Sequence, residues 1–385
     1  MQDQRSKFSL DEKVIYLNCA YMSPQLKTVE EAGIRALQRK NKPNRVTGEH
    51  FFRENEEIRT AFAKLINSKA PERIVLIPSV SYGMANVAHN IHLKAGENII
   101  CAGEQFPSNV YPWMEICNKA GAELRIIDAP ETDEHRGKKW NERILESINS
   151  QTRMVAIGHV HWADGTLYNL EAIRKRTRDV DALLVIDGTQ SVGAYPFDIQ
   201  KYQPDALICA GYKWLLGPYS IGLAHYGPAF DNGQPVENNW INRLHSDDFA
   251  GLVNYQEQYQ PGALRYEVGE RSNFNLLPMM HTAIKQLLEW SIDDIQNYCA
   301  DLVEDHLSDL KSAGYRIEDR EYRASHLFGI RLPEQLSMDE VKKALTEARI
   351  FVSFRGDCIR VAPHVYNTAD EMNTLTDILL DLSKS

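Results

Sequence analysis

Short apolar segments recur along the chain up to about Tyr226, and helix-like stretches separate many of them. The segments are nearly continuous in Ile, Val and Leu, which is typical of strands buried on both faces. They predict seven strands, at Arg73–Pro78, Glu97–Ala102, Glu123–Asp128, Arg153–Val160, Ala182–Asp187, Asp205–Ala210 and Ser220–Tyr226. Helices are predicted between several of them, for example at Val110–Ala120 and Asn169–Arg178. This alternation predicts an α/β fold with a mainly parallel seven-stranded sheet and helices on both faces. The short link between the last two strands is compatible with one antiparallel pairing.

The pattern changes after Tyr226. Residues Pro228–Gly262 are rich in Asn, Gln, Gly and Pro and predict a long irregular excursion, of the kind that is usually functional or mobile. One long helix is predicted from about Pro278 to Ala313. The remaining segments predict strands at Tyr315–Ile317, His326–Leu332, Ile350–Phe354 and Cys358–Ala362, and helices at Met338–Ala348 and Ala369–Ser383. These elements indicate a smaller α+β unit.

Composition narrows the function classes. The 385 residues include 43 Lys and Arg against 53 Asp and Glu, a formal net charge of −10, which argues against a nucleic-acid binder. Six scattered cysteines without a CxxC pair favour neither a disulfide scaffold nor a zinc ribbon. No apolar run approaches the roughly 20 residues that cross a bilayer, and the polar start does not resemble a signal peptide. We therefore expect a cytoplasmic globular protein with no metal, membrane or nucleic-acid partner.

The most informative segment is GYKWLLGP, Gly211–Pro218, which follows a predicted strand. Lys213 lies between glycines and beside Tyr212 and Trp214, whereas most lysines are solvated surface groups. A desolvated lysine loses its proton more easily and can form a Schiff base with a carbonyl. Ligands of open α/β sheets bind at strand ends, so Lys213 is a candidate catalytic residue.

Two further segments place polar groups at predicted strand ends. In ALLVIDGTQSVG, Asp187 ends an apolar run and Gln190 follows three positions later; Asp187 is either a turn former or the partner of a buried cation. In PSVSYGMANV, Ser81 and Tyr82 stand where a helix begins, and the free N–H groups there favour a phosphate. A serine at that place can equally be a simple helix cap.

These three segments, in this order, resemble the class V aminotransferase family of pyridoxal-phosphate (PLP) enzymes, which includes cysteine desulfurases, kynureninase and isopenicillin N epimerase-like proteins. The resemblance runs from YLNCAYMSP to IRVAPHVYNT. It implies fold type I, with residues 1–17 as an N-terminal arm packing with the small domain, 18–275 as the PLP-binding domain, and 276–385 as a linking helix and small domain. It also implies a homodimer with shared active sites.

The resemblance implies a role for each matching residue. Lys213 would hold PLP covalently and move protons at the substrate Cα, and Asp187 would keep the pyridine nitrogen protonated. Gln190 would hydrogen-bond the phenolic oxygen of the cofactor. Ser81, Tyr82 and Tyr212 would contact the phosphate. Phe106 matches the residue whose ring stacks on the cofactor, a position at which desulfurases have His. Without the resemblance, Phe106 would be read as an ordinary core residue.

The substrate side of the resemblance rests on Arg360, which matches the arginine that binds the substrate α-carboxylate, a role that suits a planar guanidinium. In Gly269-Glu270-Arg271-Ser272, either Ser272 or Arg271 would reach the phosphate of a partner subunit.

The sequence departs from the family at Trp162, where desulfurases have an Asn beside the cofactor oxygen. That contact is expected to be lost or to move to Asp164 or His161.

Several reactions fit this set. A persulfide-forming desulfurase needs a cysteine on a mobile segment, and Cys358 falls in or beside a predicted strand, which disfavours that chemistry. Epimerisation needs two bases, and His161 could supply the second. Transamination demands least and is the main prediction, for a small amino acid that carries an α-carboxylate. A PLP-dependent lyase or epimerase is the alternative, and a non-catalytic protein that retains the fold is the second alternative.

Overall fold

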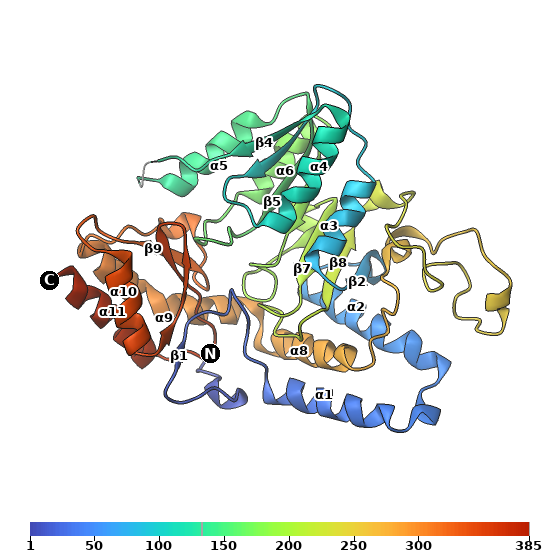
Figure 1. Cartoon of the computed structure of the whole chain (residues 1–385), viewed down its shortest axis with the longest axis horizontal. Coiled ribbons are helices and arrows are strands. Elements are labelled where there is room, and N and C mark those ends of the chain that lie inside the picture. The colour runs from blue at the N-terminus through green and yellow to red at the C-terminus, as the bar shows by residue number, and fades with distance from the viewer. Residues whose placement is uncertain (132–133, 385) are drawn as a thin grey trace.

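The computed structural model describes residues 1–131 and 134–384, which form a large α/β unit and a smaller C-terminal unit (Figure 1). Seven strands of the large unit form one sheet in the spatial order β2-β8-β7-β6-β5-β3-β4. Their bounds are β2 (Ile74–Ile77), β3 (Asn98–Ala102), β4 (Glu123–Ile127), β5 (Thr152–Gly158), β6 (Leu183–Asp187), β7 (Ala206–Ala210) and β8 (Gly222–Tyr226). β8 is antiparallel to β2 and β7, and the other pairings are parallel. The predicted seven-stranded, mainly parallel sheet is confirmed. The predicted antiparallel pairing is the one between β7 and β8, which the short link joins.

Helices cover both faces of this sheet. The helices of the large unit are α1 (Lys27–Lys40), α2 (Arg53–Leu65), α3 (Val80–His89), α4 (Tyr111–Ala120), α5 (Arg136–Ser147), α6 (Leu170–Asp179), α7 (Ile199–Tyr202) and α8 (Leu276–Trp290). Successive side chains of β6 show the two faces: Leu184 and Ile186 pack in a core with α5, α6 and α8, whereas Val185 packs in a second core with α3 and α4. Burial on both faces explains the continuous apolar runs.

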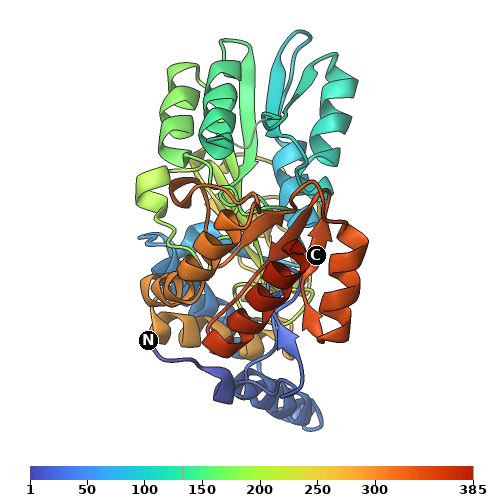
Figure 2. The ribbon, with the colours of Figure 1, turned by 90° about the vertical axis from the view of Figure 1, so that its left-hand side faces the viewer.

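The smaller unit has a core of its own. It contains a three-stranded antiparallel sheet in the order β11-β12-β9, and Figure 2 shows its helices against that sheet. The elements are α9 (Ile292–Ser312), β9 (Phe328–Arg331), α10 (Met338–Glu347), β10 (Ile350–Phe351), β11 (Ser353–Arg355), β12 (Cys358–Val361) and α11 (Ala369–Ser383). The N-terminal strand β1 (Ile15–Tyr16) pairs with β10 in parallel, so the start of the chain lies beside this unit.

Three predicted elements of the C-terminal region differ in the structure. The strand predicted at Ile350–Phe354 is divided into β10 and β11, which belong to different sheets. The predicted long helix is broken at Ser291, whose φ is 67°, into α8 and α9. The break is needed because α8 packs against α1 and α2, whereas α9 packs against α11 of the smaller unit. The predicted strand Tyr315–Ile317 is absent, and Arg316 makes only an isolated bridge with Arg331. In the described residues, no helix is long and apolar enough to cross a membrane.

Asp164 joins the two units through a buried ion-pair network. Its Oδ2 accepts hydrogen bonds from Arg136 of α5 at 2.7 Å and from Arg331 of β9 at 3.1 Å. Its Oδ1 lies 2.9 Å from Nδ1 of His161. Burial alone would raise the pKa of Asp164, but these cations outweigh burial and hold the pKa well below its usual range. The carboxylate is therefore charged in the folded protein at neutral pH.

Replacing this carboxylate should cost stability. We expect Asp164→Asn to lower the free energy of unfolding by about 3–5 kcal/mol, because two guanidinium groups would be left buried without their counter-charge. Urea denaturation would measure the change. The matched control is Asp357→Asn, which also removes a partner of Arg331 but from a side chain that is 67% exposed, and should cost at most about 1 kcal/mol.

The pH dependence of the wild-type protein provides a second check. The pKa of Asp164 is lowered by folding, so its contribution is complete above the unfolded value of about 3.9 and is lost as the pH falls toward the folded value. Equal costs for Asp164→Asn and Asp357→Asn, or an unchanged acid limb in Asp164→Asn, would contradict this assignment.

Candidate active site

A cavity of about 290 Å³ opens where several strands of the large sheet end. Gly158, Asp187 and Ala210 are the last residues of β5, β6 and β7, and all three line it. The N-terminus of α3 closes another side. Of the predicted site residues, six line this cavity: Ser81, Phe106, Asp187, Gln190, Tyr212 and Lys213. Asp187 and Lys213 are the only acidic and basic residues among the described residues that line it.

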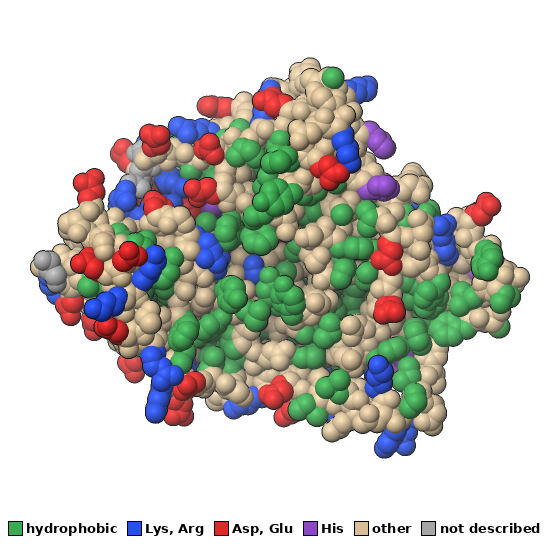
Figure 3. Space-filling view, viewed as in Figure 1, with side chains coloured by type: hydrophobic (Ala, Val, Ile, Leu, Met, Phe, Trp, Pro, Cys, Tyr) green, Lys and Arg blue, Asp and Glu red, His purple; other side chains and the backbone are tan. Residues whose placement is uncertain are grey.

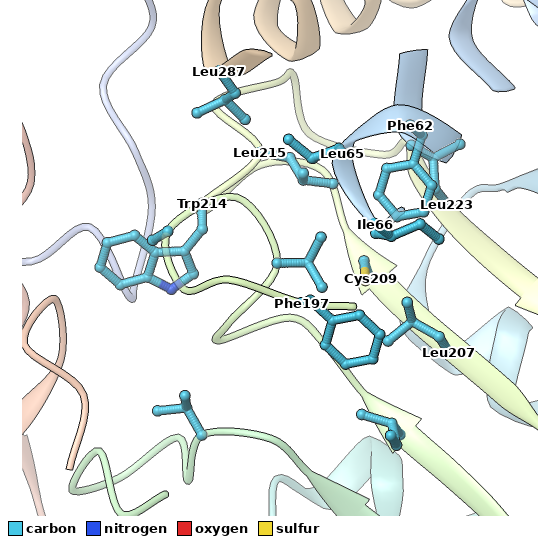
Figure 4. Packing of buried hydrophobic residues seen from close by; sticks show 14 of the residues in the cluster. Phe62, Leu65, Ile66, Phe197, Leu207, Cys209, Trp214, Leu215, Leu223 and Leu287 are labelled. Atoms are coloured by element: carbon cyan, nitrogen blue, oxygen red, sulfur yellow. The ribbon is translucent and has the colours of Figure 1, made fainter. Parts of the chain in front are cut away.

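Lys213 is held rigidly at the end of β7. The three residues that follow it, Trp214, Leu215 and Leu216, are completely buried, and Figure 4 shows Trp214 and Leu215 in the hydrophobic core. The side chain of Lys213 is itself only 7% exposed, and its Nζ lies 5.6 Å from the ring centre of Phe106.

This burial changes the acidity of the Lys213 amine. Burial lowers the pKa of Lys213 to about 8, against the opposing effect of the Asp187 carboxylate. Arg360 and Arg355 add to the lowering. With this pKa roughly a tenth of the amine is uncharged at pH 7, and so nucleophilic and basic, far more than for an ordinary lysine.

Asp187 also lines the cavity, at the end of β6. It is 9% exposed, and its Oδ1 accepts a hydrogen bond from the backbone N–H of Thr189 at 3.0 Å. Burial raises the pKa of Asp187, while the hydrogen bonds with Thr189 and the charge of Lys213 lower it. No described cation makes an ion pair with this carboxylate, so it can stabilise a cationic ligand atom. Thr189 itself lines the cavity and accepts a hydrogen bond from the N–H of Ala210. It belongs to the DGTQSVG motif, but it was not predicted from the sequence as a site residue.

Gln190 ties the two sequence motifs together. Its Oε1 accepts a hydrogen bond from Nε1 of Trp214 at 2.8 Å, and its Nε2 donates to the carbonyl of Ala20 at 3.2 Å. Gly193 permits this close approach, because a Cβ there would lie 2.3 Å from the carbonyl oxygen of Trp214 and its φ is +104°. The two motifs are thus packed directly against each other.

The start of α3 presents hydroxyl groups to the cavity. Ser79 caps the helix and accepts a hydrogen bond from the N–H of Tyr82, and Ser81 Oγ donates to Ser108 Oγ at 3.0 Å. The side chain of Tyr82 takes another course: it does not line the cavity, and its hydroxyl donates to Glu237 at 3.1 Å. Ser79 and Ser108 join the lining beyond the predicted residues.

Aromatic rings form the remaining walls. Phe106 meets Trp162 edge to face at a centroid distance of 5.3 Å, and the indole N–H of Trp162 donates to the carbonyl of Glu104 at 2.6 Å. Tyr212 packs against Tyr219 at 4.5 Å. A flat ligand ring would therefore meet aromatic faces on more than one side.

Arg360 lies behind Trp162 rather than in the cavity lining. It donates to the carbonyl of Trp162 at 2.9 Å and to Oγ of Ser353 at 3.1 Å, and its buried Nε has no partner. Burial lowers the pKa of Arg360 to about 10, and the neighbouring Arg355 adds to the lowering. Within the described residues no carboxylate makes an ion pair with this guanidinium, so it can accept an anionic ligand.

Four other predicted residues lie outside the cavity lining. His161 and Asp164 belong to the buried network that joins the two units, so the expectation that one of them replaces the lost Asn contact, or that His161 serves as a second base, is not supported by their positions. Ser272 donates its hydroxyl hydrogen to the carbonyl of Phe51 at 2.6 Å, in a different hollow. Arg271 is buried beside Glu267 at 3.5 Å.

The chain is similar in sequence to a known family and to several known proteins. Residues 39–374 match the model of the family described as Aminotransferase class-V. The "Uncharacterized aminotransferase YcbU" of Bacillus subtilis (strain 168) is 24% identical over 84% of this chain and 82% of its own length. The "Probable cysteine desulfurase" of Pyrococcus abyssi (strain GE5 / Orsay) is 24% identical over 100% of this chain and 98% of its own.

Among solved structures, a mutant of C-DES with glycine covalently linked to its PLP cofactor shares the fold, with a TM-score of 0.86 and 18% identity over 98% of this chain and 99% of that one. Another structure shows C-DES as a cystine C–S lyase in complex with its reaction product, cysteine persulfide (TM-score 0.83, 18% identity, 95% of this chain and 97% of that one).

The acidity of Lys213 can be measured directly. We expect competitive acetylation of the cofactor-free protein, followed by mass spectrometry, to give Lys213 a midpoint near pH 8, whereas exposed lysines should titrate near 10.4. Asp187→Asn should move the midpoint of Lys213 lower still, since the carboxylate raises it. Asp179→Asn, at an exposed position at the end of α6, is the control and should change nothing. A midpoint for Lys213 above pH 10 would contradict the burial argument.

Proposed function

The chain belongs to the class V aminotransferase family, and on that premise we propose that it is a PLP-dependent lyase that breaks the carbon–sulfur bond of a small sulfur-containing amino acid. The observation that carries the proposal is that all six cysteines are buried and that none of them is among the described residues that line the cavity, so no thiol faces a bound substrate to receive its sulfur. The main prediction from the sequence was an aminotransferase; the named relatives support its alternative, a lyase, better.

Pyridoxal 5′-phosphate is the cofactor, and the cavity residues fit it. Asp187 is a buried carboxylate that makes no ion pair with a described residue, and a protonated pyridine nitrogen would supply one. Lys213 would hold the cofactor covalently, and Phe106 would lie against its ring. Ser81 and the N-terminus of α3 would bind the phosphate, together with Tyr212 at the cavity wall. Bound PLP supplies an electron-withdrawing ring that takes up the electron pair left on the substrate Cα.

The chain's own groups would then position the substrate and move one proton. Arg360 would bind the α-carboxylate, and the unpaired guanidinium is suited to do so because a carboxylate would satisfy its free donors. Lys213, once released from the cofactor, would take the proton from Cα; its lowered pKa leaves it able to act as a base near neutral pH. This chemistry needs four groups, Lys213, Asp187, Gln190 and Arg360, and the chain has all of them, which supports an enzyme rather than a non-catalytic protein.

The fate of the sulfur separates this proposal from a persulfide-forming desulfurase. Cys358 is fixed in β12, its Sγ contacts the carbonyl of Ala163 at 3.5 Å, and burial raises the pKa of Cys358 to about 12. A thiolate nucleophile is therefore unavailable there. Breaking the Cβ–S bond instead releases the sulfur with the leaving group: cystine and water would give pyruvate, ammonia and cysteine persulfide.

We also propose a homodimer in which a second copy completes the site, with Ser272 or Arg271 reaching the partner's phosphate. The excursion after β8 exposes large apolar side chains that a second copy would cover, namely Trp240, Phe249, Leu252, Val253 and Tyr255. Figure 3 shows further hydrophobic side chains gathered around the middle of one face, with many of the charged groups toward its edges.

Product analysis tests the reaction. Incubated with L-cystine, the holoenzyme should form pyruvate and a persulfide in equal amounts, without accumulation of the amino form of the cofactor. Lys213→Ala should lower kcat by at least about 100-fold, because it removes the base. Cys358→Ser should keep more than about half of kcat. If a keto acid is required for turnover, or if Cys358→Ser is inactive although folded, the lyase proposal fails in favour of transamination or of a persulfide-forming desulfurase, respectively.

The dimer makes a separate prediction. Light scattering on the purified protein should give twice the mass of one chain. The double variant Val253→Asp, Tyr255→Asp should be monomeric, since it places charges in the proposed contact, while Lys175→Asp on α6, away from the excursion, should stay dimeric. A wild-type protein of single-chain mass would exclude this assembly.

A further inference from the structure

The side-chain amide of Gln190 has two ends of similar shape, so its hydrogen-bond partners decide which end is the oxygen. Oε1 accepts a hydrogen bond from Nε1 of Trp214 at 2.8 Å, and Nε2 donates to the carbonyl oxygen of Ala20 at 3.2 Å. An indole N–H can only donate, and a carbonyl oxygen can only accept. Neither partner could keep its hydrogen bond if the amide were turned over, so the two contacts fix its orientation.

This orientation leaves one donor of Gln190 free for a ligand. The amide nitrogen carries two N–H groups, and within the described residues Nε2 makes one hydrogen bond, to Ala20. Gln190 lines the cavity. An acceptor atom of a ligand bound beside Gln190 would receive the second N–H. A turned amide would present its oxygen to the same atom and repel it.

His326 holds the backbone of Gln190 in place. Its Nε2 lies 2.8 Å from the carbonyl oxygen of Gln190, and its Nδ1 lies 3.0 Å from Nε2 of Gln296 on α9. Oε1 of Gln296 accepts the backbone N–H of Ser325 at 2.9 Å, so Nε2 of Gln296 is the donor to Nδ1. Nε2 of His326 is therefore the protonated ring nitrogen and donates to Gln190. With the backbone held, rotation of the amide is the freedom that Trp214 restricts.

We propose that Trp214 is a positioning residue, which keeps the amide of Gln190 turned so that it donates to the phenolic oxygen of PLP. The inference rests on the proposed function, in which PLP occupies the cavity that Gln190 lines. A donated hydrogen bond stabilises negative charge on the phenolic oxygen. It thereby favours loss of the proton from the nitrogen through which Lys213 would hold the cofactor. A turned amide would oppose that loss.

The absorbance of the bound cofactor tests this role apart from the reaction. PLP held by a lysine absorbs at different wavelengths with and without a proton on the linking nitrogen, so spectra of the holoenzyme against pH give a midpoint. We expect Trp214→Phe to raise this midpoint by about one pH unit, because a hydrogen bond to a charged oxygen is lost. The matched control is Trp290→Phe. Trp290 donates to Oε1 of Gln4 at 3.2 Å, outside the cavity lining, and the midpoint should not move.

A double variant shows whether the effect passes through Gln190. Gln190→Met removes the amide and should itself raise the midpoint, and adding Trp214→Phe should then change it no further. If Trp214→Phe shifts the midpoint equally with and without the amide, Trp214 acts by packing alone and the proposal is overturned. None of these variants replaces the titratable groups that act on the charge of Lys213, namely Asp187, Arg360, Arg355 and Cys19.

The remaining outcomes separate this role from the proposed reaction. A spectrum and midpoint unchanged in Trp214→Phe would overturn the positioning role. If that variant does not fold, 3-benzothienylalanine in place of Trp214 decides the matter, because sulfur replaces the N–H while the ring keeps its shape, and the same rise is expected. A wild-type protein that binds no PLP would overturn the cofactor site and this inference with it. If the midpoint rises as expected but cystine yields no pyruvate, the positioning role stands and the lyase proposal fails.

Discussion

The site depends on keeping one amine out of water. Lys213 follows a buried strand and precedes three completely buried apolar residues, so its backbone cannot turn the side chain toward solvent without exposing the core. Desolvation and two nearby arginines lower its pKa, while Asp187 raises it, and the balance lies at about 8. An amine with that acidity can exchange a proton with a carbon acid near neutral pH, which an ordinary surface lysine at about 10.4 cannot do as readily.

The cavity is also a joint product of segments that are far apart in sequence. Trp162 belongs to the large unit, yet its carbonyl accepts a hydrogen bond from Arg360 of the smaller unit. Asp164, two residues on, fixes the same segment to β9 through Arg331. The N-terminal segment contributes as well: Asn18 accepts a hydrogen bond from Ser353, which in turn accepts one from Arg360. A shift between the two units would therefore move Arg360, the residue proposed to bind the substrate, relative to Lys213.

Much of this arrangement could be predicted from the sequence. The rest could not, for physical reasons that individual residues show. Strands buried on both faces leave continuous apolar runs, so the sheet was predictable, as was the position of Asp187 at the end of β6. The break at Ser291 was not, because it follows from which core each half of the helix packs against rather than from any glycine or proline at that point. Arg355 was not predicted as a residue near the site, because whether its charge is paired depends on which carboxylates lie near it in the fold.

The positions of Tyr82 and His161 show the same limit. Tyr82 has a polar side chain at the start of α3, but its ring turns to Glu237 because a second partner is available outside the cavity. His161 is one residue from a cavity wall, yet Asp164 holds its ring in the joint between the units. Spacing along the chain predicts which edge of a sheet a residue reaches; competing partners then decide where its side chain points.

Charge at the site runs against the charge of the whole chain. The protein carries a formal net charge of −10, and its long-range field would repel an anionic substrate. That field is screened over a Debye length of about 8 Å at physiological salt, whereas Lys213, Arg355 and Arg360 act at contact distance from partly desolvated positions. Among the described residues of the cavity lining, Asp187 is the one acid that opposes them, and it is the group proposed to pair with the cofactor. For a ligand bound beside Trp162, these local charges therefore outweigh the global charge of the chain.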